Sequence, residues 1–241
     1  MAAEYVFPSF TPTYHHDVYP AIDPTQPSLS CEGKRIFITG AGLGIGRAIA
    51  LAFTKAHAHS IALVGRNLVD LEATAALIAA LSTNTTKTCI CVADIAVQSQ
   101  VQTAMKASIE HLGGVPDVLV NNAGVFKGAG PLIDVDMDEV WTSYEINVRG
   151  GLFVTQAFLR AVRDHASLDE PRVVLNVSSG AAHFPYAPGA MAYQTTKMAF
   201  AKVMEGLHHE YPHWQVVSFQ VCLYLPIPKS TATDRTDDSR V

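Results

Sequence analysis

From Lys34 onward, short apolar runs alternate with longer amphipathic stretches. The apolar runs are rich in β-branched residues and apolar on both faces, which is typical of strands buried in a parallel sheet. The predicted strands are Arg35–Thr39, Ser60–Val64, Thr88–Ala93, Val118–Asn121, Arg172–Val177 and Gln215–Val221. Helical periodicity fills the gaps between them, for example in Ile45–His57, Leu68–Leu81, Val97–His111 and Val140–Arg163. Strand followed by helix, repeated, predicts a doubly wound α/β fold around a parallel sheet.

Two flanking segments differ in composition from this central part. Residues 1–33 form an arm with five prolines and five aromatic residues. Proline at this density disfavours a regular helix and favours an extended chain. The aromatic residues predict that the arm packs on the domain or on a partner subunit. Residues 226–241 are predicted to be an irregular, disordered tail, which leaves one domain over residues 34–225.

The composition suits one large domain and excludes several functions. Of the 241 residues, 49% are hydrophobic and only 16% are charged, against about 25% charged in an average soluble domain. Lysine and arginine number 17 and aspartate and glutamate 22, a net charge of −5. Without a basic run, this balance argues against nucleic acid as a partner. No run approaches the roughly 18 apolar residues of a spanning helix, so a membrane is not a predicted partner either.

Four cysteines in a chain of this length do not make a disulfide framework. Cys89 and Cys91 alternate along a predicted strand and therefore point to one face. A zinc site would need a second pair, but Cys31 and Cys222 stand alone. We therefore expect buried thiols and no metal. The first residues lack the basic and apolar regions of a signal peptide, and reduced cysteines then predict a cytoplasmic location.

The first predicted strand runs into a glycine-rich turn that opens directly into a helix. Residues 39–46 read Thr-Gly-Ala-Gly-Leu-Gly-Ile-Gly. Such glycines let the backbone turn sharply and approach a pyrophosphate, whose charge the helix N-terminus stabilises. The usual dinucleotide spacing is not literally met, because the glycines fall at Gly40, Gly44 and Gly46. An ordinary glycine-rich turn is the alternative to the dinucleotide site that we predict.

The ends of the next two strands bear on the choice of cofactor. An NAD site would place an acidic residue about 20 positions further on, but the second strand runs into Gly65-Arg66-Asn67. Arg66 could pair with a 2′-phosphate, since its planar fork suits that group; otherwise it is a surface arginine. Asp94 could accept from the adenine amino group or cap the following helix. The sequence therefore favours NADP over NAD.

Three further segments carry polar chemistry. The fourth strand ends in Asn121-Asn122-Ala123-Gly124, which is either a structural turn or a segment that holds the sheet edge near an adenosine ribose. Ser178 and Ser179 end the fifth strand at the edge where such folds bind ligands. Tyr193 and Lys197 share a helix face. An ammonium beside a phenol favours the phenolate, which suits proton transfer to a carbonyl oxygen.

In this order, the motifs resemble those of the short-chain dehydrogenase/reductase family, in the branch made of one Rossmann domain. The resemblance covers Lys34 to about Val221 and includes Thr-Gly-x-x-x-Gly-x-Gly, Asn-Asn-Ala-Gly and Tyr-x-x-x-Lys. It implies an NAD(P)-dependent oxidoreductase that interconverts a carbonyl and a secondary alcohol on a small or medium apolar molecule. We also expect a homo-oligomer.

The resemblance implies four catalytic roles. Tyr193 would pass a proton to or from the substrate oxygen, and Lys197 would favour the phenolate and hold the nicotinamide ribose. Ser179, ahead of Ser178, would position the substrate oxygen. Asn147 would hold a water that links Lys197 to solvent. The expected cofactor contacts are Thr39, Gly40, Gly44, Ile45, Gly46, Arg66, Asp94, Asn121, Ala123, Gly124, Tyr193 and Lys197.

The sequence departs from the family's pattern in two places. Ser179 lies fourteen residues before Tyr193, where the family usually shows thirteen. After the sixth strand, the family continues with Pro-Gly, a threonine and a seventh strand, none of which is evident here. The sequence therefore predicts a truncated or mis-spliced product with six strands and the seventh missing. The alternative function is a cofactor-binding protein with little or no turnover.

Overall fold

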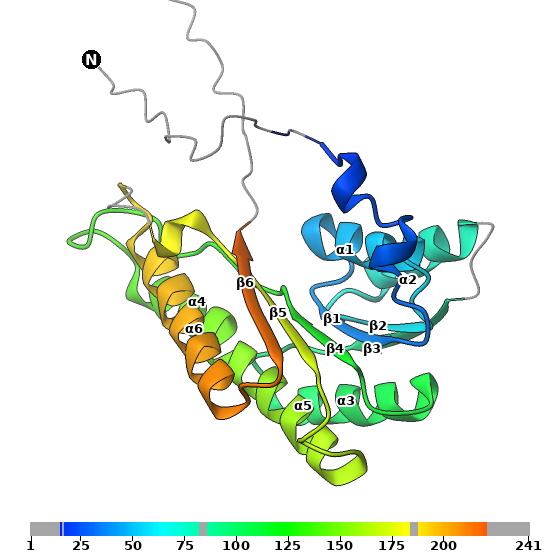
Figure 1. Cartoon of the computed structure of the whole chain (residues 1–241). Helices are drawn as coiled ribbons and strands as arrows, with labels where there is room; N and C mark the ends of the chain where they lie inside the picture. Colours follow the sequence, from blue (N-terminus) through cyan, green and yellow to red (C-terminus); the bar gives the residue numbers. More distant parts are fainter. Residues whose placement is uncertain (1–14, 16, 82–85, 184–187, 221–241) are drawn as a thin grey trace, which may run out of the picture.

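Six parallel strands form one sheet at the centre of the molecule (Figure 1). The computed structural model describes residues 15, 17–81, 86–183 and 188–220. The strands are β1 (Arg35–Thr39), β2 (Ser60–Gly65), β3 (Lys87–Val92), β4 (Val118–Asn121), β5 (Val173–Ser178) and β6 (Gln215–Gln220). Their order is β3-β2-β1-β4-β5-β6, so the winding reverses between β1 and β4. The predicted doubly wound fold of the Rossmann type, in a single α/β domain, is confirmed.

The boundaries of β1 to β5 differ from the predicted ones by at most one residue, and β6 begins at Gln215 as predicted. The predicted end of the sixth strand, Val221, lies outside the described residues. Burial on both faces was wrong for β3 and β6, which flank the described sheet and pair on one side only. Val92 is 55% exposed and Val217 is 45% exposed. The prediction that a seventh strand is missing, and the predicted tail over residues 226–241, concern residues that lie outside the described part of the chain.

Helices cover both faces of the sheet (Figure 1). One face carries α1 (Gly44–Lys55) and α2 (Leu68–Ala80), and the other carries α3 (Gln98–Leu112), α5 (Gly151–His165) and α6 (Met191–Glu210). The prediction of a single helix over Val140–Arg163 is wrong in detail, because this stretch is divided. It consists of α4 (Met137–Tyr144), a π-helical turn over Glu145–Gly150, and α5. Asn147 lies within this π-helical turn, and its side chain bonds to Val125 and Thr196 outside the turn.

The described part of the arm is not extended as predicted. It forms two 3-10 turns, Pro20–Ile22 and Pro27–Leu29, and each begins at a proline. Proline suits that position because its fixed φ fits a helical turn and its missing N–H would have no partner there. The arm joins the domain where the Cys31 N–H donates to the Ala56 carbonyl at 2.7 Å.

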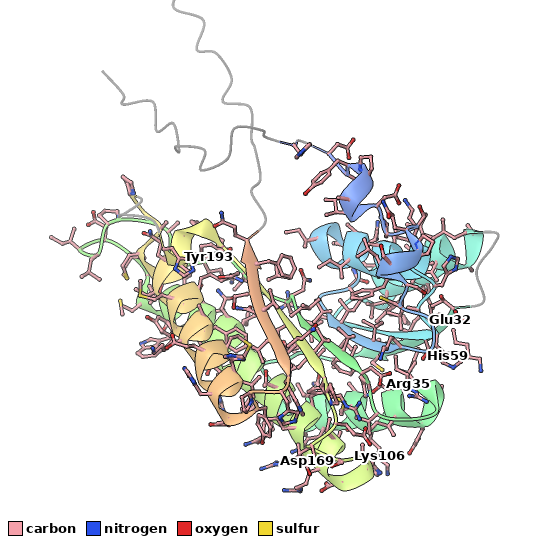
Figure 2. The ribbon with its side chains drawn as sticks, in the orientation of Figure 1. Glu32, Arg35, His59, Lys106, Asp169 and Tyr193 are labelled. Carbon is pink, nitrogen blue, oxygen red and sulfur yellow. The ribbon has the colours of Figure 1, made fainter. Side chains whose placement is uncertain are left out.

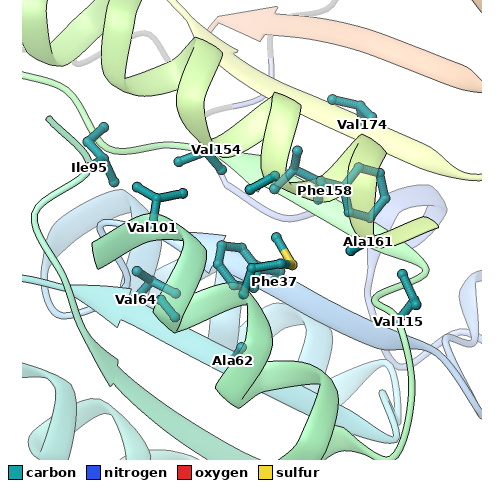
Figure 3. Close-up of a cluster of buried hydrophobic side chains, with 14 of the residues drawn as sticks. Phe37, Ala62, Val64, Ile95, Val101, Val115, Val154, Phe158, Ala161 and Val174 are labelled. Atoms are coloured by element: carbon teal, nitrogen blue, oxygen red, sulfur yellow. The ribbon is translucent and has the colours of Figure 1, made fainter. Parts of the chain in front are cut away.

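The strands bury their two faces in separate hydrophobic clusters. Phe37, Leu119 and Val174 belong to the cluster beneath α3, α5 and α6 (Figure 3). Ile36 and Ile38 belong to the cluster on the opposite face, with α1 and α2. Successive β1 residues therefore alternate between two buried layers, as expected of a central parallel strand. No helix in the described part of the chain is long and apolar enough to cross a bilayer.

Cys89 and Cys91 are buried on one face of β3, as predicted, with their sulfur atoms 3.6 Å apart. Each Sγ lies within the apolar cluster beneath α3. Among the described residues, no group of three or more His, Cys, Asp or Glu side chains could hold a metal ion.

We expect Phe158→Ala to lower the free energy of unfolding by about 3–5 kcal/mol, because it leaves a cavity that its neighbours fill only in part. Phe158 is fully buried and packs edge-on against Trp214, with ring centroids 5.8 Å apart. The control is Leu152→Ala, because Leu152 lies on the same helix but is 42% exposed. This change should lower the free energy of unfolding by less than about 1 kcal/mol. Urea unfolding measures both, and equal losses would contradict this account of the core.

Candidate active site

The carboxyl ends of β1 and β4 are joined by one buried hydroxyl. Thr39 donates from Oγ1 to the Val120 carbonyl at 3.2 Å. The same oxygen accepts from the N–H groups of Asn122 at 3.0 Å and Ala123 at 3.1 Å. Thr39 is 1% exposed, so its hydroxyl bonds only within the protein interior. It fixes the loop after β4 against the end of β1. This is the point in a doubly wound sheet where ligands bind.

Asn122, which the sequence analysis did not single out, braces the glycine turn. Its Nδ2 donates to the carbonyls of Thr39 at 2.8 Å and Gly40 at 3.2 Å. Asn121 points the other way, because its Nδ2 donates to Thr155 Oγ1 on α5 at 3.0 Å. Of the two adjacent asparagines, the second therefore shapes the turn and the first serves the helix layer. The alternation of side chains at a strand end is the sequence signal for this difference.

The glycine turn packs too closely for larger residues. Gly40 has φ +66° and Gly44 has φ +51°, a conformation that side chains rarely adopt. A Cβ on Gly46 would lie 2.1 Å from the Gly40 carbonyl oxygen. The turn and the first residues of α1 therefore form a backbone surface with free space beside Gly44, where a Cβ would meet no atom within 4 Å.

The N-terminus of α1 suits an anion. Leu43 precedes the helix and no side chain caps it, and the first turn contains no acidic residue. The first N–H groups of a helix have no partner within the helix and carry partial positive charge. Ile45 lies in this first turn. The end of α1 can therefore bind a phosphate group.

Arg47 and Thr74, also not predicted, hold the outer side of this turn. Arg47 donates from Nη2 to the Gly42 carbonyl and from Nε to Thr74 Oγ1 at 3.0 Å. Thr74, fully buried on α2, lies with its hydroxyl 3.1 Å from the carbonyl oxygens of both Ala41 and Gly42. These contacts fix the turn against α2.

The ends of β2 and β3 lie at the same edge of the sheet. Arg66 is exposed directly after β2, and Asn67 accepts from the Val69 N–H and caps α2. Asp94 accepts from the Ala96 N–H at 2.9 Å. The alternative that Asp94 caps α3 is wrong, because the N-cap of α3 is Val97, without a side-chain cap. The Asp94 carboxylate instead stabilises the turn that precedes the helix.

Asn147 connects three elements from the π-helical turn. Its Oδ1 accepts from the Val125 N–H at 2.8 Å, and its Nδ2 donates to the Val125 carbonyl at 2.8 Å and to Thr196 Oγ1 at 3.0 Å. Both amide protons are therefore used, while Oδ1 keeps a second lone pair. A Cβ on Gly124 would lie 3.2 Å from this Oδ1 and 3.5 Å from Lys197 Nζ. Glycine at 124 thus leaves the amide oxygen and the ammonium facing the same space.

Lys197 is half-buried and donates to the Val177 carbonyl at 2.9 Å. Its Nζ lies 5.7 Å from the centroid of the Tyr193 ring. Burial lowers the pKa of Lys197 from 10.5 to about 8, because a charged amine loses hydration. None of the ion pairs in the described part of the chain includes Lys197.

Tyr193 lies near the start of α6, at the end of the molecule where the strands end (Figure 2). Ser179 lies at the end of β5, and its Oγ accepts from the Ala181 N–H at 3.2 Å. Ser178 is buried, and its Oγ has no hydrogen-bond partner among the described residues. Gln194 ties the serine turn to α6 by donating to the Ala181 carbonyl at 3.3 Å.

Phe126 is a further residue that the sequence analysis missed. Its ring lies beside that of Tyr193, with centroids 5.1 Å apart and planes tilted by 51°. Phe126 is 55% exposed. Its place two residues after Asn-Asn-Ala-Gly is the signal that could have identified it.

A sequence model of the family described as short chain dehydrogenase matches residues 34–239. The short chain dehydrogenase pigC of Monascus ruber is 37% identical over 213 residues, which cover 88% of this chain and 68% of that protein. D-erythrulose reductase of Gallus gallus is 34% identical over 182 residues, covering 74% and 67%.

Solved structures give the same result. A short-chain type dehydrogenase/reductase from Mycobacterium marinum has a TM-score of 0.71 at 28% identity and covers 78% of this chain and 74% of its own. NAD⁺-bound xylitol dehydrogenase has a TM-score of 0.67 at 26% identity and covers 78% and 69%.

The buried ammonium should make stability depend on pH. The folded pKa of Lys197, about 8, lies below its ordinary value of 10.5, so the cost of burying the charge is full below pH 8 and fades toward pH 10.5. Lys197→Met removes this cost. We therefore expect the free energy of unfolding of the variant, relative to the wild type, to fall by about 2 kcal/mol between pH 7 and pH 9.5.

Urea unfolding of both proteins at the two pH values measures this change. Lys202→Met is the matched control, because Lys202 lies on the same helix with its side chain 74% exposed. A difference between the wild type and Lys197→Met that does not vary with pH would contradict the burial of the charge.

Proposed function

The chain belongs to the short-chain dehydrogenase/reductase family, and from this membership we propose that it is an NAD(P)-dependent oxidoreductase that interconverts a carbonyl and a secondary alcohol. One observation carries the proposal. Tyr193 and Lys197 lie with Asn147 at the sheet edge where an uncapped helix end and a tight glycine turn also lie. A proton-transfer group therefore stands at the same sheet edge as a phosphate-binding surface.

The residues of the turn fit a dinucleotide. Gly40, Gly44 and Gly46 allow the backbone to approach a pyrophosphate, and the N–H groups from Ile45 onward would donate to it. Ala123 and Gly124 would border the ribose, and Asp94 would accept from the adenine amino group. Thr39 and Asn121 would act from the interior, by positioning this edge, because the Thr39 hydroxyl and the Asn121 Nδ2 donate to protein atoms.

When bound, the nicotinamide supplies or takes up the hydride of the reaction. Tyr193 moves the proton at the substrate oxygen. The Lys197 ammonium, whose Nζ lies 5.7 Å from the centre of the Tyr193 ring, would stabilise negative charge that develops on the phenol oxygen during proton transfer and would hydrogen-bond to the nicotinamide ribose. Asn147 would hold, through the open lone pair of Oδ1, a water that passes protons between Lys197 and solvent.

We assign the positioning of the substrate oxygen to Ser179. Its half-buried hydroxyl stands at the carboxyl edge of β5, and the contact from Gln194 ties its turn to α6. In its contact with Ala181, Ser179 Oγ accepts a hydrogen bond, which leaves its own proton available for the substrate. Ser178 is the second candidate, since its buried hydroxyl also has an unused proton.

The finer assignments are proposals of the same kind. Arg66 favours NADP, because an exposed guanidinium directly after β2 suits a 2′-phosphate. A small or medium apolar carbonyl compound is the proposed substrate. By their names, two of the similar proteins act on erythrulose and on xylitol, which supports a small carbonyl or alcohol. Location in the cytoplasm and assembly into a homo-oligomer stay predictions.

Tyr193→Phe should reduce turnover by roughly 10²–10⁴-fold, because it removes the proton that acid–base catalysis needs. The dissociation constant of the cofactor should stay almost unchanged, and steady-state kinetics with cofactor titration measure both. Tyr144→Phe is the control, since Tyr144 packs on Trp141. Substantial turnover in Tyr193→Phe would overturn the assignment. A wild type that binds cofactor without turnover would favour the alternative of a cofactor-binding protein.

Arg66→Ala should weaken NADP binding by about tenfold or more and leave NAD binding nearly unchanged, because only the 2′-phosphate accepts a charge-assisted hydrogen bond there. Calorimetric titration with each cofactor measures the ratio. Arg149→Ala, which removes an exposed arginine paired with Glu145, controls for a general change in surface charge. Equal weakening of both cofactors, or a wild type that prefers NAD, would refute the role of Arg66.

A further inference from the structure

Phe126 presents an open aromatic ring beside the phenol of Tyr193. Tyr193 covers one part of the ring, at a centroid distance of 5.1 Å, and 55% of the residue is exposed. Exposed aromatic side chains cost hydration free energy unless a partner covers them. The position of this one is specific, because it adjoins the group that would transfer the proton.

The backbone around Phe126 is held rigidly. On one side, the N–H and carbonyl of Val125 both bond to the Asn147 amide, each at 2.8 Å. On the other side, the N–H and carbonyl of Lys127 both bond to Ser143 Oγ, at 3.2 and 3.0 Å.

The loop is fastened further along as well. The Gly128 N–H donates to Glu139 Oε2 at 3.2 Å. The ring therefore stands on a fixed base between two residues whose backbone groups are both satisfied. A rigid aromatic platform loses little entropy when a ligand covers it.

We propose that Phe126 is a specificity-determining residue that stacks on a flat, unsaturated group attached to the carbonyl carbon of the substrate. This inference rests on the proposed function, because Tyr193 must contact the carbonyl oxygen. A substrate held there places the substituent on its carbonyl carbon next to the neighbouring ring. Aromatic rings prefer offset or edge-to-face contacts with other rings, so a planar substituent is selected over a saturated one of equal size.

Two ketones that differ only in this property test the proposal: acetophenone, with a phenyl ring, and cyclohexyl methyl ketone, with a saturated ring. In the wild type, the enzyme with oxidised cofactor should bind acetophenone about three- to tenfold more tightly, as measured by ligand-observed NMR titration. In Phe126→Leu, which keeps an apolar side chain without the ring, this preference should disappear. Affinity for cyclohexyl methyl ketone and for the cofactor should change less than about twofold.

Trp141→Leu is the matched control. Trp141 is also an exposed aromatic residue, 61% exposed, and it packs on a tyrosine, Tyr144, with the same 51° tilt at 5.5 Å. It should leave the preference intact. Equal affinity of the wild type for the two ketones, or an unchanged preference in Phe126→Leu, would overturn the role of Phe126. The binding readout keeps this test separate from the proposed reaction, which Tyr193→Phe tests through turnover.

Discussion

Between β1 and β4 the sheet reverses its winding, and the buried hydroxyl of Thr39 holds the two strand ends together there. Two parallel strands that carry their helices to opposite faces leave a crevice at their carboxyl ends. The hydroxyl at the end of β1 donates to the Val120 carbonyl of β4 and accepts from the N–H groups of Asn122 and Ala123 in the loop that follows β4. Because the loop after β4 is fixed in this way, Asn122 can brace Gly40 and Asn147 can hold Val125. The glycine turn and the loop that carries Phe126 are therefore both positioned by the contacts of Thr39 with β4 and the loop after it.

Most of the fold could be predicted from the sequence, because a strand buried on both faces leaves a short apolar run that few other structures produce. β1 and β4 matched at both ends. The predictions failed where tertiary contacts override local pattern. The exposure of β3 and β6 depends on their place in the sheet, which the run of residues does not encode. The π-helical turn contains Asn147, whose amide bonds to Val125 and Thr196. Both partners lie far from Asn147 in sequence, so no local pattern indicates these contacts.

For the candidate site, the sequence indicated residue types more accurately than their directions. Glycine spacing and the pair Tyr193 and Lys197 predicted chemistry at one sheet edge, since the carboxyl ends of parallel strands all lie there. At the end of a strand, a shift of one residue along the chain decides whether a polar side chain faces that edge or the interior. Asn121 and Asn122 differ in this way. Phe126 escaped notice because a single exposed aromatic residue has no periodicity, and only its contact with Tyr193 gives it meaning.

The charges at this edge form a consistent arrangement although the chain as a whole carries −5. The first turn of α1 has no acidic residue, and Lys197 donates to a carbonyl rather than to a carboxylate. A carboxylate beside the Lys197 ammonium would raise the pKa of Lys197 back toward its ordinary value. It would also offset the positive charge that the ammonium presents to its surroundings. With a neutral acceptor, the ammonium has no ion-pair partner among the described residues and stands 5.7 Å from the centre of the Tyr193 ring, at some cost in stability. The N-terminus of α1 at the same sheet edge favours an anionic ligand, so the phosphate-binding turn and the proton-transfer pair that we propose would both rely on positive groups without a carboxylate partner among the described residues.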